Sequence, residues 1–548
     1  MENEEKKISI CKGSHEIPLI KKTISSILHE SAKVCPNQKA IISHIEDKTY
    51  TYKELNSEVN LACRALINLG AKKDDRISIW STNRTEWLIT NYAAMRLGLI
   101  VVTINPAFRT SEVKYVLENS ESTFLFMAEN FRTFSYLDSI SSIKDNLIKL
   151  KSVVVFGNKV GPYLSWDSFM KLGFKINKNI VSVIEEKIAF DQPCHIQYTS
   201  GTTGKPKGAL LTNYNLINNG YFVGLNQNFS INDKICLPVP FFHCFGSVLG
   251  AFAALSHGSC IVLPSESFDP KICMEVIQKY KCTALYGVPM MFISILSLPN
   301  LLNYNFKSLR TGAIGASPCP KQVMKKIINI LNIKEITIVY GMTETSPISF
   351  QTNIGDDVDL QVSTVGNINP HIEAKVIDSN KNFILDRGNP GELCIKGYSV
   401  MKEYWKNKTE TKKAIDKDGW MRTGDLVLMR DDGYLEIVGR IKDTIIKGGE
   451  NIYPREVEEF LIKIDQIEQA YVFGVPDKTY GEIVGCWVKL EKNKIISENE
   501  IKNKCKNKIA SFKIPSFFRI VDEFPMTASG KVQKFKMSEK EIALKINK

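Results

Sequence analysis

The sequence predicts an α/β protein with a large N-terminal domain of parallel and mixed sheets flanked by helices, a β-rich subdomain and a small α+β C-terminal domain. Short β-rich runs alternate with amphipathic segments through the first four hundred residues, a rhythm typical of parallel sheets covered by helices. After about residue 360, short strands separated by turn residues dominate. A polar segment at residues 439–443 then precedes a final block with a pattern of its own.

The elements of the first domain follow from hydrophobic periodicity and from helix-ending glycines. Predicted helices cover residues 52–69, 86–97 and 111–119, with Gly70 and Gly98 after the first two and Thr110 or Ser111 as N-cap of the third. Predicted strands cover residues 39–43, 76–80, 100–104, 123–127, 194–198, 235–237, 260–263, 284–285 and 335–339. The later strands run into polar or Gly/Pro-rich loops, and ligands of open α/β sheets bind at such strand ends.

The rest of the chain reads as β-rich and then as a separate small domain. Predicted strands cover residues 374–377, 391–395, 434–438, 469–474, 483–490 and 518–521. One helix is predicted to begin at Pro454, a favoured first-turn residue, and a Lys-rich helix covers residues 498–508. We therefore predict domains at residues 1–440 and 441–548.

Length and composition restrict the class of protein. A chain of 548 residues needs two or more domains, and 44% hydrophobic with 24% charged residues is ordinary for a globular protein, which excludes disorder and collagen. The net charge of +12 favours anionic ligands such as nucleotides or CoA, although general solubility is the simpler explanation. No basic arm concentrates the charge, so we expect no nucleic-acid partner.

The cysteines, the N-terminus and one uncharged stretch indicate where in the cell the protein is expected. The 13 cysteines show no C-x-x-C spacing, which favours free thiols in a reducing compartment. The acidic N-terminus resembles neither a secretory signal nor a transit peptide, so we expect a cytoplasmic protein rather than one of the mitochondrial matrix. Residues 235–265 carry no charge, yet Pro238 and Pro240 favour a buried strand–loop–helix–strand over a transmembrane helix. Peripheral membrane contact remains open.

The strongest motif is Tyr198-Thr-Ser-Gly-Thr-Thr-Gly-Lys-Pro-Lys-Gly208, directly after a predicted strand. Glycines let backbone N–H groups approach a phosphate, hydroxyls donate to its oxygens, and lysines neutralise its charge. The spacing is not that of the usual mononucleotide loop. A flexible linker is the alternative, but it would not carry Lys-Pro-Lys-Gly between two apolar flanks.

This motif resembles the phosphate-binding signature of the adenylate-forming superfamily, which contains acyl-CoA synthetases, peptide-synthetase adenylation domains and firefly luciferase. Four further motifs resemble those of the superfamily and occur in the same order: residues 340–347, 420–425, 439–443 with 447–454, and 525–531. The resemblance is closest to the medium-chain acyl-CoA synthetase branch, family member 2, in residues 315–320 and 446–454. It implies an acyl-CoA ligase that uses ATP, Mg²⁺, CoA and a carboxylic acid, and forms an acyl-AMP intermediate.

The resemblance also implies the site residues. It assigns ATP binding to Thr199, Ser200, Gly201, Thr202, Thr203, Gly204, Lys207, Gly315, Ala316, Ser317, Tyr340, Gly341, Asp425 and Arg440. Catalytic roles go to Thr343, Glu344, His243 and Lys531, the hinge to Lys442, and CoA contacts to Gly448, Gly449 and Asn451.

Some of these roles also follow from the residues themselves. The Glu344 carboxylate is the hard oxygen ligand that magnesium prefers, and Tyr340 offers a flat ring for adenine. Asp425 can accept both ribose hydroxyls, although a turn Asp after Gly424 is an alternative. Taken singly, Arg440 and Lys531 are ordinary surface cations, and Gly448-Gly449 is an ordinary turn.

The acid is indicated by Pro240-Phe-Phe-His-Cys-Phe-Gly246 and the apolar residues after it. His243 resembles a gate position of fatty and aryl acid ligases, with a core histidine as the alternative. Apolar neighbours favour an alkyl or aryl tail, and no charged residue is placed to bind an amino acid's ammonium group. The sequence assigns neither the chain length of the acid nor an oligomeric state.

Two other functions remain open at this point. One is a fatty acyl-AMP or aryl-acid ligase that loads a carrier protein, although no carrier domain follows Lys531 in this sequence. The other is a silent binding protein for acyl groups or nucleotides, which loss of Lys531 or Glu344 would indicate; both residues are present.

Overall fold

The chain forms two compact units in the computed structural model, which describes residues 7–157, 160–199, 206–379, 381–506, 508–526 and 532–546. The larger unit contains Cys11–Glu373 and Ile395–Met421, and the smaller one contains Met1–Ile10, Ala374–Cys394 and Arg422–Lys548. The predicted boundary after residue 440 lies within the smaller unit and stays a prediction.

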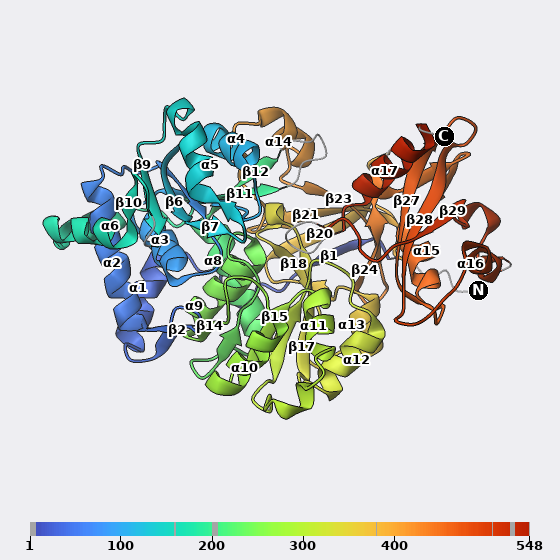
Figure 1. Ribbon diagram of the computed structural model, residues 1–548, viewed down its shortest axis with the longest axis horizontal. Coiled ribbons are helices and arrows are strands. Elements are labelled where there is room, and N and C mark those ends of the chain that lie inside the picture. The colour runs from blue at the N-terminus through green and yellow to red at the C-terminus, as the bar shows by residue number, and fades with distance from the viewer. Residues whose placement is uncertain are drawn as a thin grey trace. The chain divides into compact units, whose positions relative to one another are not determined.

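Two sheets organise the larger unit (Figure 1). The first has the order β10(Leu164–Ser165), β9(Ser152–Phe156), β6(Ser122–Ala128), β4(Arg76–Trp80), β5(Ile100–Ile104), β11(Pro193–Thr199), β12(Lys207–Thr212) and β22(Glu403–Tyr404). Its strands are parallel from β10 to β11, whereas β12 pairs antiparallel with both β11 and β22. The signature motif therefore lies where the parallel part of the sheet ends.

The second sheet has nine strands and is parallel in its centre. Its order is β19(Asn367–Ile368), β18(Ile348–Gln351), β17(Glu335–Gly341), β16(Thr311–Ile314), β15(Ala284–Gly287), β13(Lys234–Cys236), β14(Cys260–Leu263), β2(Lys39–Ser43) and β3(Lys48–Thr51). The strands from β17 to β2 are parallel, which places the carboxyl ends of β13, β16 and β17 at one edge.

Helices separate the sheets and cover their outer faces. Alternate residues of β4 show this: Ile77 and Ile79 join the core that both sheets share, whereas Trp80 joins the core on the opposite face. The shared core includes side chains of α1(Ile24–Val34), α2(Tyr52–Asn68), α3(Thr85–Arg96), α8(Asn213–Asn226), the π-helix η3(Phe245–Phe252) and α9(Ala253–His257). The outer cores include α4(Thr110–Ser120) and α5(Tyr136–Ile143) on the first sheet, and α10(Pro270–Tyr280), α11(Pro289–Leu296) and α12(Lys321–Asn329) on the second.

The smaller unit is built on a sheet with the order β26(Glu450–Ile452), β25(Ile445–Lys447), β28(Gly481–Leu490) and β27(Ile467–Asp477), with β29(Phe517–Ile520) parallel to β28. The helices of this part are α15(Pro454–Leu461), α16(Glu498–Cys505) and α17(Lys534–Ile546). A further five-stranded sheet has the order β1(Ile10–Lys12), β20(Ile372–Ile377), β21(Gly391–Gly397), β23(Met421–Met429) and β24(Leu435–Arg440).

The predicted fold class is confirmed, and most element bounds agree with the prediction. Strands β2, β4, β5 and β14 have the predicted ends, and the other predicted bounds fall within three residues of the observed ones. One prediction was wrong: the N-cap of α4 is Arg109, not Thr110 or Ser111. The Arg109 backbone N–H donates to the Glu112 carboxylate over 2.8 Å, so this pair closes the helix terminus without a hydroxyl cap.

The uncharged stretch of residues 235–265 folds as β13, a loop, η3, α9 and β14, which confirms the predicted strand–loop–helix–strand. Throughout the part of the chain that the structure describes, no helix has the length and apolarity needed to cross a membrane.

Candidate active site

Strands β11 and β12 hold the two ends of the signature motif side by side. They pair antiparallel, with Thr199 opposite Lys207 in the register. The intervening Ser200, Gly201, Thr202, Thr203 and Gly204, all predicted to bind ATP, lie outside the described residues. The motif is therefore a short connection whose ends are fixed by sheet hydrogen bonds.

Glu344 lies at the end of β17, in the short helical turn η5(Thr343–Thr345), and is 5% exposed. Its Oε1 accepts hydrogen bonds from the Thr199 hydroxyl at 3.2 Å and from the Tyr404 hydroxyl at 2.9 Å. The structure thus brings Glu344 to the edge of the signature motif, and two hydroxyl donors orient its carboxylate. The pKa of Tyr404 is raised mainly by burial and also by the nearby carboxylate of Glu344. The Tyr404 hydroxyl therefore keeps its proton and donates a hydrogen bond to Glu344.

Lys207, at the start of β12, is held by two neighbours in the same unit. Its Nζ lies 3.1 Å from Glu410 Oε2 and 4.4 Å from the centre of the Tyr404 ring. The ammonium groups of Lys413 and Lys207 lower the pKa of Glu410, so this carboxylate stays ionised. Lys207 is positioned at the motif by an ion pair and a cation–π contact.

The chain passes very close to itself at Gly341, the last residue of β17. A Cβ built on Gly341 would lie 1.7 Å from the Pro347 carbonyl oxygen, so any side chain would displace this turn. Tyr340, beside it, is half-buried, and its ring centre lies 6.3 Å from that of Phe350. Thr343 lies in the same turn as Glu344.

Gly315, Ala316 and Ser317 follow β16 at the neighbouring strand end. Gly315 is buried, and a Cβ on it would lie 2.8 Å from Val339 Cγ2 of β17. Ala316 has a left-handed backbone with φ of 72°, and both Ala316 and Ser317 are exposed. The same Cβ on Gly315 would lie 3.8 Å from Phe245 Cε1, which places this turn next to the loop that carries His243.

The His243 loop, residues 238–244, is fixed by the buried side chain of Asn83. The Asn83 amide donates to the Val239 carbonyl at 2.9 Å, and its oxygen accepts from the Phe241 N–H at 2.8 Å. Gly246 closes the loop, because a Cβ there would lie 2.3 Å from the Pro240 carbonyl oxygen. His243 is half-buried, and its Nδ1 accepts from the Phe245 N–H at 3.2 Å.

A buried polar chain joins this loop to β11. The Cys244 thiol donates to Gln197 Oε1 at 2.6 Å, and Gln197 Nε2 lies 3.3 Å from His195 Nδ1. His195 Nε2 lies 2.8 Å from Asn91 Oδ1, so Nε2 carries the proton and Nδ1 accepts. Burial lowers the pKa of His195 to about 3, and the ring is neutral.

Apolar residues pack closely beside the same loop. They are Pro238, Phe268, Leu285, Tyr286, Gly287, Met291, Phe292 and Ile295, and they leave no space for a water molecule between them. The Tyr286 ring lies 5.8 Å from that of Phe245, at the start of η3. Phe245, just after the His243 loop, therefore lies near both these apolar side chains and the turn at Gly315.

The remaining predicted site residues belong to the smaller unit. Asp425 pairs with Arg440 across β23 and β24, and Arg440 Nε lies 2.9 Å from Asp425 Oδ1. Asp425 is 6% exposed and lies within a strand, so the alternative of a turn Asp was wrong. Lys442 is exposed in the single turn η6(Ile441–Asp443), and Lys531 lies outside the described residues.

Gly448 and Gly449 form the two-residue turn between β25 and β26, with φ of 60° and 89°. Both angles favour glycine, which explains the pair as a hairpin turn. Asn451 is exposed on β26.

Sequence reasoning missed three residues that position these groups: Tyr404, Asn83 and Gln197. Asn83 could have been noticed as a polar residue just after a predicted strand, at residues 76–80. Tyr404 and Gln197 had no such signal, because their roles depend on contacts between segments far apart in the sequence.

Comparisons with known proteins agree with this geometry. A model described as the AMP-binding enzyme matches residues 28–405, and one described as the AMP-binding enzyme C-terminal domain matches residues 456–531. The chain belongs to the AMP-binding enzyme family. The predicted resemblance to adenylate-forming enzymes is therefore confirmed.

Relatives of this AMP-binding enzyme cover nearly the whole chain. YngI of Bacillus subtilis (strain 168) is 40% identical over an alignment of 540 positions, which covers 96% of this chain and 98% of YngI. The mitochondrial medium-chain acyl-CoA ligase ACSF2 of Danio rerio is 37% identical over 96% of this chain and 90% of its own length. The crystal structure of ATP-bound MatB from Rhodopseudomonas palustris has a TM-score of 0.85 at 25% identity and covers 95% of this chain and 99% of MatB.

Proposed function

We propose that this AMP-binding enzyme is an AMP-forming acid–thiol ligase that joins a fatty acid, of medium chain length, to CoA with ATP. Support comes from relatives named medium-chain acyl-CoA ligases and from the five motifs of the sequence. The observation that carries the proposal is Glu344, whose carboxylate is oriented by Thr199 and Tyr404 at the edge of the phosphate-binding motif.

The reaction has two steps. A carboxylate oxygen of the acid attacks the α-phosphorus of ATP, and the bond to pyrophosphate breaks to give acyl-AMP. The CoA sulfur then attacks the acyl carbonyl carbon, the bond to AMP breaks, and the thiol proton leaves to solvent. No protein nucleophile is needed, so catalysis rests on positioning and on stabilisation of developing charge.

The proposed roles follow the two strand ends and the paired strands of the smaller unit. The phosphates are bound by Thr199, residues 200–204 and Lys207. Adenine is bound by Tyr340, Gly341 and residues 315–317. The ribose is bound by Asp425, which Arg440 holds in place. Lys531 contacts the acid carboxylate and the α-phosphate in the first step. Asn451 and the turn at Gly448 and Gly449 contact the CoA arm in the second.

Glu344 would hold Mg²⁺, which when bound neutralises phosphate charge. The residues fit such a cation, because an oriented carboxylate is a hard oxygen ligand. Among the described residues, no group of three or more His, Cys, Asp or Glu side chains could hold a metal, so the remaining ligands would be phosphate oxygens and water.

The tail of the acid would enter past His243 toward the apolar side chains around Tyr286 and Phe292, which are packed together here and would have to move apart to admit it. Each methylene buried there would contribute about 0.8 kcal/mol, so we expect affinity to depend on chain length. We also propose a reducing, cytoplasmic compartment, because all 13 cysteines are free thiols.

The test is AMP release from ATP with a panel of acids from acetate to palmitate, plus benzoate and a cinnamate, each with and without CoA. We expect release that depends on CoA and is highest with medium-chain acids, and Lys531→Ala serves as the inactive control. Release independent of CoA would favour a carrier-loading ligase, and release with none of the acids would favour a silent binding protein.

A further inference from the structure

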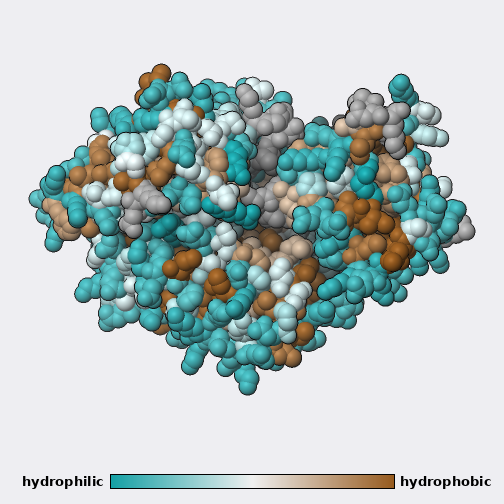
Figure 2. Space-filling model, in the orientation of Figure 1, coloured by the Kyte–Doolittle hydropathy of each residue, from teal (hydrophilic) through white to brown (hydrophobic). Residues whose placement is uncertain are grey.

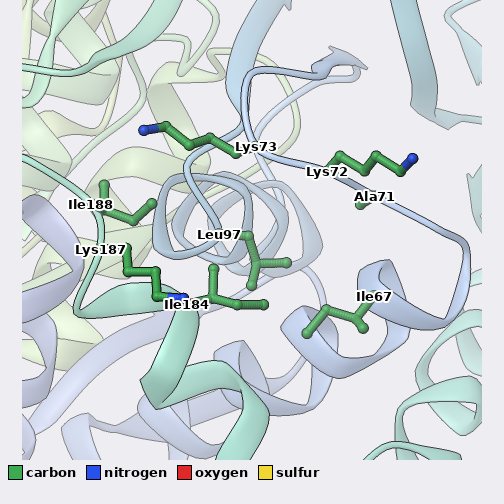
Figure 3. A pocket seen from close by; sticks show the side chains of 8 residues that line it. All are labelled: Ile67, Ala71, Lys72, Lys73, Leu97, Ile184, Lys187 and Ile188. Atoms are coloured by element: carbon green, nitrogen blue, oxygen red, sulfur yellow. The ribbon is translucent and has the colours of Figure 1, made fainter.

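A cavity of about 250 Å³ opens on the larger unit among residues that the proposed chemistry does not use. It is lined by Ile67, Ala71, Lys72, Lys73, Leu97, Ile184, Lys187 and Ile188 (Figure 3). These come from the end of α2, the turn that follows it, the end of α3 and the segment around α7(Asn179–Glu185). In Figure 3, Lys72 and Lys73 extend in opposite directions, and Ile67, Leu97 and Ile184 lie below them in this view.

The segment beside the cavity exposes further large apolar side chains. Phe174 is 72% exposed in the turn η2(Gly173–Lys175), and Ile180 and Val183 on α7 are 40% and 52% exposed. Both the turn and the helix are packed on the unit through other residues. A Cβ on Gly173 would lie 2.5 Å from the Leu61 carbonyl of α2, and the opposite side of α7 already buries Val181.

Lysines surround these apolar side chains. Lys72, Lys73, Lys171, Lys175, Lys178 and Lys187 are all exposed. Two nearby acids are engaged within the protein: Glu185 accepts from Ser25 at 2.7 Å and lies 3.7 Å from Arg96, and Asp75 accepts from the Lys72 N–H at 3.0 Å. Among residues 72–74 and 167–191, these six exposed lysines stand against four exposed acids, Asp74, Asp167, Glu186 and Asp191, which leaves a local excess of two positive charges.

We infer that this lysine-rimmed apolar surface, formed by the cavity, Phe174, Ile180, Val183 and the six lysines, docks on a bilayer that contains anionic phospholipid. Separate apolar side chains interleaved with lysines match an interface where acyl chains lie beneath a layer of phosphates. Lysine side chains can lay their methylene groups along an apolar surface while their ammonium groups extend to the phosphates. The cavity would then receive the end of a lipid acyl chain. In Figure 2, brown hydrophobic residues are exposed among hydrophilic ones near α6(Trp166–Leu172), the helix before Phe174.

Membrane docking would extend the proposed function, but it does not require the proposed function to be correct. Fatty acids partition into bilayers, so a ligase docked in this way would meet its substrate where the substrate is concentrated. Vesicle binding can be measured with no substrate present, so failure of either idea can be told from failure of the other.

The test is co-sedimentation of the full chain with phosphatidylcholine vesicles that contain or lack phosphatidylglycerol. We expect binding that requires phosphatidylglycerol and falls as NaCl rises. The triple variant Phe174→Ser, Ile180→Ser, Val183→Ser should lower the partition coefficient about tenfold or more. Lys175→Glu, Lys178→Glu, Lys187→Glu should abolish the preference for anionic vesicles.

Leu302→Ser with Lys307→Glu is the matched control, because both residues are exposed in the same unit away from this segment. Melting temperature and lipid-free AMP release should be unchanged in every variant. Equal binding to both vesicle types, or wild-type binding by the triple variants, would overturn the inference. So would a change in molecular mass of the lipid-free variants, because the surface would then join two copies of the chain.

Discussion

At the scale of single residues, the Tyr404 hydroxyl is the contact most directly tied to Glu344. Tyr404→Phe removes the donor at 2.9 Å and leaves the ring over Lys207. A hydrogen bond to a charged group contributes about 1.5–3 kcal/mol, so we expect kcat/KM for MgATP to fall about tenfold or more. AMP release across a Mg²⁺ titration measures this. Tyr163→Phe, which loses the contact of its hydroxyl with Ser141, is the control; an unchanged Mg²⁺ requirement in Tyr404→Phe would remove Tyr404 from the site.

His195 provides a residue-scale prediction about pH. Its pKa is about 3 in the folded protein and near 6.5 when unfolded, so the unfolded state binds a proton first as pH falls. The contribution of His195 to the free energy of unfolding is therefore complete above pH 6.5. Between pH 6.5 and pH 3 this contribution falls by about 1.4 kcal/mol for each pH unit. Melting temperatures between pH 7 and 4.5 should therefore fall less steeply for His195→Gln than for the wild type or for His29→Gln. Parallel curves would contradict the assignment.

At the scale of elements, the loop before η3 depends on one buried amide. Asn83→Ala leaves the Val239 carbonyl and the Phe241 N–H without their partner, a cost of about 1–3 kcal/mol for each group. We expect a lower melting temperature together with a KM for the acid raised several-fold, since the loop carries His243, and little change in KM for ATP.

Asn218→Ala is the control for this variant. Asn218 is also buried and holds both the N–H and the carbonyl of Ile20, so its loss should lower stability similarly without affecting the acid. Equal effects of both variants on KM for the acid would show that Asn83 acts only through stability.

Elements were predictable where the pattern along the chain is local. The buried strands at residues 76–80 and 100–104 and the glycine-terminated helices follow from periodicity, and the motif residues Thr199 and Glu344 follow from spacing. The contacts of Glu344 with Tyr404, and of Cys244 with Gln197, join segments 60 and 47 residues apart. No local pattern encodes such contacts. The π form of the helix at residues 245–252 was not predicted, because an uncharged and mostly apolar segment has no periodicity that separates it from an α-helix.

At the scale of the whole molecule, the two half-reactions should respond to different residues. Lys531→Ala should lower acyl-AMP formation by about two to three orders of magnitude and leave thioester formation from supplied acyl-AMP largely intact. Pyrophosphate release and acyl-CoA formation measure the two steps separately. The control is Lys494→Ala, an exposed lysine of the smaller unit. Equal loss in both steps would contradict the role assigned to Lys531.

The proposed hinge gives the complementary prediction. Lys442→Pro fixes the backbone φ within the turn η6, so it should impair thioester formation selectively, about tenfold or more, if the chain rotates there between the two steps. Lys442→Ala keeps the backbone free and should leave both steps near wild type. Unchanged thioester formation in Lys442→Pro would place the hinge elsewhere.

The distribution of thiols has a practical consequence for following that rotation. Eleven of the 13 cysteines are buried, and only Cys11 and Cys35 are half-buried. Burial raises the pKa of thiols such as Cys63 and Cys260 to about 12, so they react slowly with maleimides. Cys11→Ser with Cys35→Ser should therefore give a nearly silent background for dye labelling. One new cysteine in each unit would then report their separation by fluorescence energy transfer during turnover, with the native core left intact.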